Sequence, residues 1–245
     1  MIRGTLLAVL SLMMVFEPAE AQTNRETLPP GQARVLVESY ARCVVRFQAV
    51  RVRAALQAYF AAGESDLPVD RDCVGNAAYS TAEMSFTSEA NRYALAEALY
   101  AADYGKRPAI AFDAVPMERP PEIGEIDPAK LPSDARRAQA IRESHDRAVV
   151  TRYLLIVGDC VARTAPDATK SLVMSGVETR AEAAALATIQ PTLAECLPKG
   201  QTVRFNRTSL RGILALSAYR LSDAVARGAK QTGLLQVPAS RLAER

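Results

Sequence analysis

Four cysteines constrain the fold of this 245-residue chain more than any other feature of its sequence. The tetrapeptide Cys-Val-Val-Arg begins at Cys43 and Cys-Val-Ala-Arg begins at Cys160, and each follows a stretch with helical spacing of apolar residues. Cys73 and Cys196 follow later, one after each tetrapeptide. Four cysteines in an exported chain most often form two disulfides, and their number alone allows three pairings.

A longer pattern also occurs twice, each time after the later cysteine of a pair. It reads Phe, five residues, Arg, two residues, Leu-Ala, three residues, Tyr, and it runs without a gap from Phe86 to Tyr100 and from Phe205 to Tyr219. Two matching segments in the same order indicate an internal duplication. The copies are roughly Ala33 to Tyr104 and Arg147 to Val225.

The duplication favours disulfides within each copy, Cys43 with Cys73 and Cys160 with Cys196. In the chain-entropy model each such loop stabilises its copy by about 3.7 kcal/mol, which matters for a unit with little core of its own. Free buried thiols are the alternative, and a Cys43–Cys160 link would contradict the two-unit interpretation.

The residue composition favours helices over strands. Alanine, leucine and arginine are frequent, and these residues have high helix propensity. Apolar spacing predicts helices at Gly31–Phe60, Thr87–Asp103, Ala135–Val157 and Glu178–Leu197, and a further helix after an Asn206 cap. The first of these stretches is compatible with one long helix or with two short ones separated by a break near Val52. We therefore expect an all-α protein of two homologous, disulfide-stapled helical units joined by a Pro-rich linker.

The predicted domain organisation has five parts. Residues 1–21 have a basic start, an apolar run of about a dozen residues and small residues before Gln22, which is typical of a signal peptide. Residues 22–104 form unit 1, residues 105–134 with their six prolines form the linker, and residues 135–228 form unit 2. We expect the linker either to pack across a neighbouring surface or to stay mobile, and residues 229–245 to be a flexible tail.

Few residues in the sequence suggest catalysis or metal binding. His145 is the single histidine, and its charged helical surroundings predict an exposed surface residue. The cysteines lack the close spacing of zinc ligands, and Cys-x-x-Cys, Gly-x-Ser-x-Gly and phosphate-binding glycine motifs do not occur. The net charge of +3 is spread along the chain, which disfavours a nucleic-acid partner. We expect no metal, no cofactor and no catalytic residue.

The residues repeated in both copies are the remaining site candidates. Each motif helix carries an arginine and a tyrosine on its Leu-Ala face, and each first cysteine is followed by another arginine. An arginine beside a tyrosine hydroxyl can hold a carboxylate or phosphate ligand, or it can bond groups within its own unit. Because both copies keep the pattern, we favour the structural role for Arg92, Tyr100, Arg211, Tyr219, Arg46 and Arg163.

Together, the Cys-Val-x-Arg start, the later cysteine and the Phe…Arg-x-x-Leu-Ala-x-x-x-Tyr helix resemble a group of small, uncharacterised exported proteins of Gram-negative bacteria. The resemblance covers most of the chain after the signal peptide. It implies export to the periplasm or beyond and a repeat architecture, and it implies no activity.

Two classes of function follow from these features. The favoured one is a non-catalytic envelope interaction module that binds a protein or peptide and has no stable membrane span. The alternative is a ligand-binding or hydrolytic protein with a pocket between the units, formed by Arg92, Arg211 and nearby tyrosines. The balance of the sequence is against an enzyme.

Overall fold

The computed structural model describes residues 28–62, 65–76, 88–113, 115–116, 120, 122–197 and 205–228. Within these ranges the protein is helical, as expected, and no described helix is both long and apolar enough to span a bilayer. The predicted signal peptide and C-terminal tail lie outside the described residues. The elements are α1 (Pro30–Ala62), α2 (Arg71–Asn76), α3 (Ser88–Tyr104), the 3-10 helix η1 (Pro128–Lys130), α4 (Ala135–Thr164), α5 (Pro166–Met174), α6 (Arg180–Cys196) and α7 (Arg207–Ala226).

Two disulfides link consecutive parts of the chain. Cys43 on α1 is bonded to Cys73 on α2, and Cys160 on α4 is bonded to Cys196 at the end of α6. This is the pairing that the repeated sequence favours. Each bond closes a local loop, so neither disulfide crosses from the first half of the chain to the second.

Helix α1 is a single element with a kink. The sequence left open one long helix or a break near Val52; the structure places the kink earlier, at the non-helical residue Gln48, with φ −129° and ψ 28°. The Gln48 side-chain amide donates a hydrogen bond to the carboxylate of Asp70 at 2.7 Å, just before α2. The bend of α1 is therefore coupled to the segment that carries Cys73.

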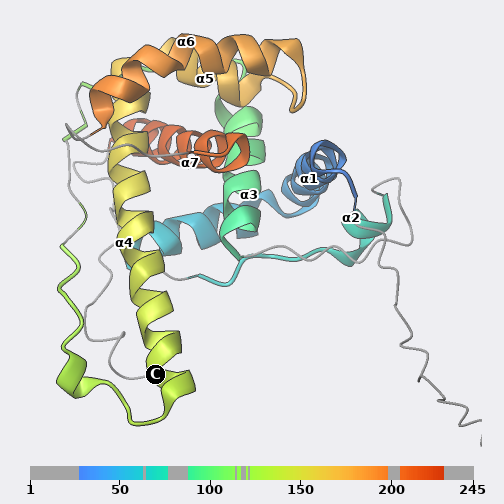
Figure 1. Ribbon diagram of the computed structural model, residues 1–245. Coiled ribbons are helices and arrows are strands. Elements are labelled where there is room, and N and C mark those ends of the chain that lie inside the picture. Colours follow the sequence, from blue (N-terminus) through green and yellow to red (C-terminus); the bar gives the residue numbers. More distant parts are fainter. Residues whose placement is uncertain are drawn as a thin grey trace, which may run out of the picture.

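The two motif helices, α3 and α7, pack against each other at the centre of the molecule. Helix α1 covers α3, while α4 and α5 pack against α7, and α5 lies beside α6 at one end of the bundle (Figure 1). All residues of α7 from Leu210 to Ala224 are buried, which marks it as the core helix.

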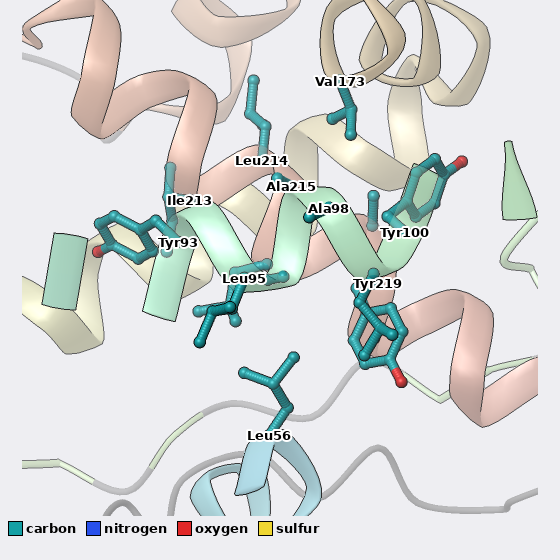
Figure 2. Packing of buried hydrophobic residues seen from close by; sticks show 14 of the residues in the cluster. Leu56, Tyr93, Leu95, Ala98, Tyr100, Val173, Ile213, Leu214, Ala215 and Tyr219 are labelled. Carbon is teal, nitrogen blue, oxygen red and sulfur yellow. The ribbon is translucent and has the colours of Figure 1, made fainter. Parts of the chain in front are cut away.

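One hydrophobic cluster includes residues from both predicted units. It brings Leu56 of α1 and Leu95 of α3 together with Leu214 of α7 and Leu155 of α4. Figure 2 shows the α1, α3 and α7 part of this cluster around the crossing of the two motif helices. The two halves of the described chain thus share a core.

Residues between α3 and α4 pack along α4, which is the first of the two alternatives for the linker. Phe112 and Val115 are buried in a small cluster with side chains of α4 and α7. Further along, His145 Nε2 lies 2.8 Å from the carbonyl oxygen of Gly124, and the His145 side chain is only 17% exposed. The expectation of an exposed His145 is wrong, because the linker covers it.

The end of α4 also differs from the expectation. The helix continues past the predicted end at Val157 to Thr164, and Pro166 then opens α5, which the sequence analysis did not predict. Proline suits the first turn of a helix, where its missing N–H would have no partner. The chain therefore turns sharply between α4 and α5.

Two glycines allow α7 to approach its neighbours closely. A Cβ atom added to Gly212 of α7 would lie 2.6 Å from the Tyr93 side chain of α3. A Cβ added to Gly158 of α4 would lie 2.5 Å from Ser217 Oγ and 3.2 Å from the carbonyl oxygen of Ile213, both on α7. The contacts of α7 with α3 and with α4 are therefore closer than any residue with a Cβ atom at Gly212 or Gly158 would allow.

We predict that Gly158→Ala destabilises the protein, although alanine favours helices by up to about 1 kcal/mol over glycine. The added methyl group would push against the Ile213 backbone, and overpacking of this kind costs about 1–3 kcal/mol. The free energy of unfolding in urea measures the effect. Gly124→Ala is the control, since nothing lies within 4 Å of its added Cβ. Equal stability of both variants would contradict close packing at Gly158.

Candidate functional site

Arg211 occupies a buried position in the first turns of α7. The helix begins after Asn206, whose side-chain oxygen accepts a hydrogen bond from the backbone N–H of Ser209 at 2.7 Å, as predicted for a cap. The guanidinium of Arg211, on a residue only 2% exposed, donates through Nε and Nη2 to the two carboxylate oxygens of Glu97 at 2.9 and 2.8 Å. This bidentate pair connects α7 to α3.

The same guanidinium also reaches the end of α5 and the start of α6. Nη1 of Arg211 donates to Ser175 Oγ at 3.0 Å and to Glu182 Oε1 at 3.3 Å. Nη2 donates to the carbonyl oxygens of Val173 at 3.3 Å and of Ser175. Carbonyls at a helix C-terminus lack intrahelical partners, and a cation there is favourable. Arg211 thus bonds three helices besides its own.

Glu182 links Arg211 to α1. It lies in the first turn of α6, where its N–H donates to the capping hydroxyl of Thr179 at 3.2 Å. Its carboxylate accepts hydrogen bonds from the Glu178 backbone N–H at 2.9 Å, from both terminal nitrogens of Arg34 and from Arg211. We call Arg34, Glu97, Glu182 and Arg211 the Glu182 network; it joins α1, α3, α6 and α7.

Burial affects the two carboxylates of this network differently. Burial alone would raise the pKa of Glu182, but the hydrogen bonds from Arg34 and Glu178 and the positive charges of Arg34 and Arg211 bring it below its ordinary value. For Glu97, burial dominates and raises the pKa despite the bonds from Arg211. Glu182 is consequently the member whose negative charge the fold stabilises.

Arg92, at the matching position of the first motif helix, has a different environment. Its guanidinium carbon lies 3.7 Å from the centre of the Tyr59 ring of α1, a cation–π geometry. Arg211 instead pairs with Glu97 and Glu182. The structure therefore does not bring the two repeated arginines together in one site.

The repeated tyrosines are core residues away from Arg211. Tyr104 lies between them, with ring centres 5.8 Å from Tyr100 and 6.0 Å from Tyr219. Figure 2 places Tyr100 and Tyr219 at the opposite end of the cluster from Tyr93. Burial raises the pKa of both hydroxyls, so they stay protonated at neutral pH. They do not form a ligand site with the arginines.

The arginines that follow the first cysteines also differ from each other. Arg163 donates to Asp159 at 2.8 Å and to the carbonyl oxygens of Phe112 and Val115, at 2.9 and 2.6 Å, and of Pro116, at 3.0 Å. It therefore bonds the segment between α3 and α4 to α4. Arg46 lies on the surface, 5.6 Å from the ring of its neighbour Phe47.

Arg220 shares the carboxylate that Arg163 uses. It is buried in α7 and donates to Asp159 Oδ1, while Arg163 donates to Oδ2. Asp159 is itself only 3% exposed. This second buried ion cluster connects α4 and α7, and it has no counterpart at the matching position of the first half, where Arg42 precedes the cysteine.

A cavity of about 250 Å³ lies beside the Glu182 network. Its walls come from the first part of α1, from α3, from the end of α5 and from the start of α7, and they include Arg211 and Tyr93 but not Arg92. Among the described residues, no group of three or more histidine, cysteine or acidic side chains is placed to hold a metal ion. The cavity is the feature that a ligand would occupy.

The sequence analysis missed the acidic partners Glu97, Glu182 and Asp159. One signal was available for Glu182, since Thr179-Arg180-Ala181-Glu182 before an Ala-rich run has the Thr-x-x-Glu pattern of a helix start. For Glu97 and Asp159 the sequence offers no comparable pattern. Their role depends on which helix lies opposite.

We predict that replacing Arg211 by alanine destabilises the protein more than replacing Arg92 by alanine. Arg211→Ala leaves the buried Glu97 without its cationic partner and removes one of the two arginines bonded to Glu182, and it should cost about 3–5 kcal/mol of unfolding free energy. Arg92→Ala removes a cation–π contact and should cost about 0.5–2 kcal/mol. Urea unfolding of the oxidised protein measures both, and equal losses would contradict the distinct environments.

We also predict a pH signature for Glu182→Gln. A carboxylate with a lowered pKa in the folded state stabilises the fold fully above its unfolded pKa of about 4.3, and this stabilisation is lost as the pH falls through the folded value. The stability difference between wild type and variant should therefore be largest above about pH 5 and shrink below about pH 4. Urea unfolding curves of wild type and Glu182→Gln across this pH range measure the difference in unfolding free energy. If that difference grew on acidification, the ion pairs of Glu182 would not be its cause.

Comparisons with known proteins give no match for this chain. No protein-family model matches it. No curated protein matches it, and no solved structure matches it.

Proposed function

We propose that this chain is an exported, non-catalytic helical protein of the bacterial envelope that binds a partner protein or peptide. The signal-peptide pattern of residues 1–21 and the two disulfides support export to an oxidising compartment, periplasmic or extracellular. The uses of the repeated arginines support a non-catalytic role. Arg211 bonds Glu97 and Glu182, Arg163 bonds Asp159 and linker carbonyls, and Arg92 stacks on a core tyrosine.

We further propose that residues 22–104 and 135–228 are two copies of one unit joined by the Pro-rich segment 105–134. The packing offers support in each half. Motif helix α3 packs against α1, which carries Cys43, and motif helix α7 packs against α4, which carries Cys160. The inserted helix α5 and the longer α6 account for the greater length of the second copy.

An exposed apolar surface at the kink of α1 is the observation that supports a protein partner. Phe47 and Val50 flank Gln48 and are 67% and 76% exposed. The hydrogen bond from Gln48 to Asp70 brings the neighbouring Val69, also 67% exposed, to the same region. Large apolar side chains gathered on a surface are typical of interaction sites. We call Phe47, Val50 and Val69 the kink surface.

Basic side chains border the kink surface. Arg46 lies beside the Phe47 ring, and Arg51 Nη1 donates to the side-chain oxygen of Gln48 at 3.0 Å. Both arginines are exposed. A partner that presents an apolar side chain next to a carboxylate would complement this surface in both shape and charge.

Crosslinking in the cell tests this proposal. A photoreactive amino acid at Phe47 should capture one envelope protein reproducibly, and Val50→Asp should abolish that capture without changing the melting temperature. The same label at Val149, an exposed position on α4, is the matched control. Capture of the same set of proteins from both positions would show that the kink surface has no specific partner.

The alternative of a pocket between the two halves has one observation in its favour. The cavity of about 250 Å³ is lined by both halves of the chain and includes Arg211. Arg92, which the alternative also requires, lies elsewhere over Tyr59. The charged pair in the wall, Arg211 with Glu97, is bonded internally, which favours ligand binding over hydrolysis.

A further inference from the structure

The cavity beside the Glu182 network has mostly apolar walls. Small or flexible side chains from α1, α3 and α5 line it, namely Ala33, Val37, Ala94, Ala98, Val173 and Met174. The cavity is partly open to solvent, with the exposed side chains of Arg42 and Met174 in its wall, and small-molecule sites are typically concave pockets with mostly apolar walls. A cavity of about 250 Å³ between packed helices is therefore a candidate binding site.

Every charged side chain in the cavity wall already has a partner of opposite charge. Arg211 pairs with Glu97, and Arg42 pairs with Glu38. Arg34, the remaining one, pairs with Glu178 and Glu182. An ionic ligand would compete with these pairs; the Arg42–Glu38 pair is exposed, but the Arg211–Glu97 and Arg34–Glu182 pairs are buried, and breaking a buried pair is costly. The wall therefore favours an uncharged ligand.

The same ion pairs connect helices that line the cavity. The Glu182 network fixes α1 and α3 relative to α6 and α7 through bonds from Arg34 and Arg211. Three of the four helices in the network, α1, α3 and α7, also line the cavity, so the network bonds the walls of the cavity to one another. Met174, 40% exposed, is the flexible residue in the wall, and its thioether can adapt to a guest.

The volume limits the size of the ligand. An apolar cavity of about 150 Å³ is large enough for benzene, and pockets for drug-sized molecules span about 300–1,000 Å³. The present cavity, about 250 Å³, lies between these limits. We propose that it binds one small, uncharged, apolar molecule the size of one or two fused rings, held by contacts with α1, α3, α5 and α7.

Titration of the purified, oxidised protein with indole tests this site, because indole is neutral and has the required size. We expect saturable binding of one indole per chain by calorimetry. Indole-3-carboxylate should bind at least about tenfold more weakly, since its charge has no free partner in the wall. Absence of saturable indole binding, or tighter binding of the carboxylate, would overturn the proposal.

A cavity-filling variant locates the binding. Ala94→Leu places a larger side chain in the cavity and should weaken indole binding by at least about tenfold, while the melting temperature stays equal or rises. Ala54→Leu is the matched control, on an exposed position of α1 outside the cavity, and should bind like wild type. Unchanged binding in a folded Ala94→Leu protein would show that the site is elsewhere.

A second variant covers the case in which Ala94→Leu does not fold. Met174→Trp alters the partly exposed residue in the wall and should weaken indole binding without affecting the core. Wild-type affinity in this variant would count against the site. The inference does not rest on the protein partner proposed above, and capture from Phe47 in the Ala94→Leu protein separates the two.

Discussion

The buried ion pairs around Glu182 determine how the helices of this protein meet. Burying charges costs free energy, and the cost is offset only when partners and geometry are well matched. Here the Glu182 carboxylate accepts hydrogen bonds from Arg34 and Arg211, and Arg211 also donates to the carboxylate of Glu97. These bonds require α1, α3, α6 and α7 to be in one relative position. Hydrophobic burial is non-directional, so the network adds directional contacts between these helices to the burial of the shared cluster.

Some of this structure could be predicted from local sequence. The four cysteines lie in repeated surroundings, which favoured the observed pairing of Cys43 with Cys73 and of Cys160 with Cys196. The helix cap at Asn206 and the helices α3 and α7 could also be predicted from the sequence, because caps and amphipathic faces depend on residues only a few positions apart. These features set element type and local loop closure.

Other features depend on residues far apart in the chain and could not be predicted. Arg211 and Glu97 are 114 positions apart, and the sequence around each residue contains no pattern that predicts their pairing. Arg92 and Arg211 share a motif position yet differ completely in environment, because Tyr59 faces one and Glu182 the other. The kink at Gln48 and the cavity have the same origin: both arise where separate elements meet.

The connectivity of the disulfides has a consequence for how the protein is made. Each bond joins cysteines that are neighbours in chain order. A chain that emerges N-terminus first into an oxidising compartment presents Cys43 and Cys73 to each other before Cys160 is available. Oxidation in order of emergence therefore yields the native bonds directly. With the export proposed above, formation of the two bonds would need an oxidant but little reshuffling by a disulfide isomerase.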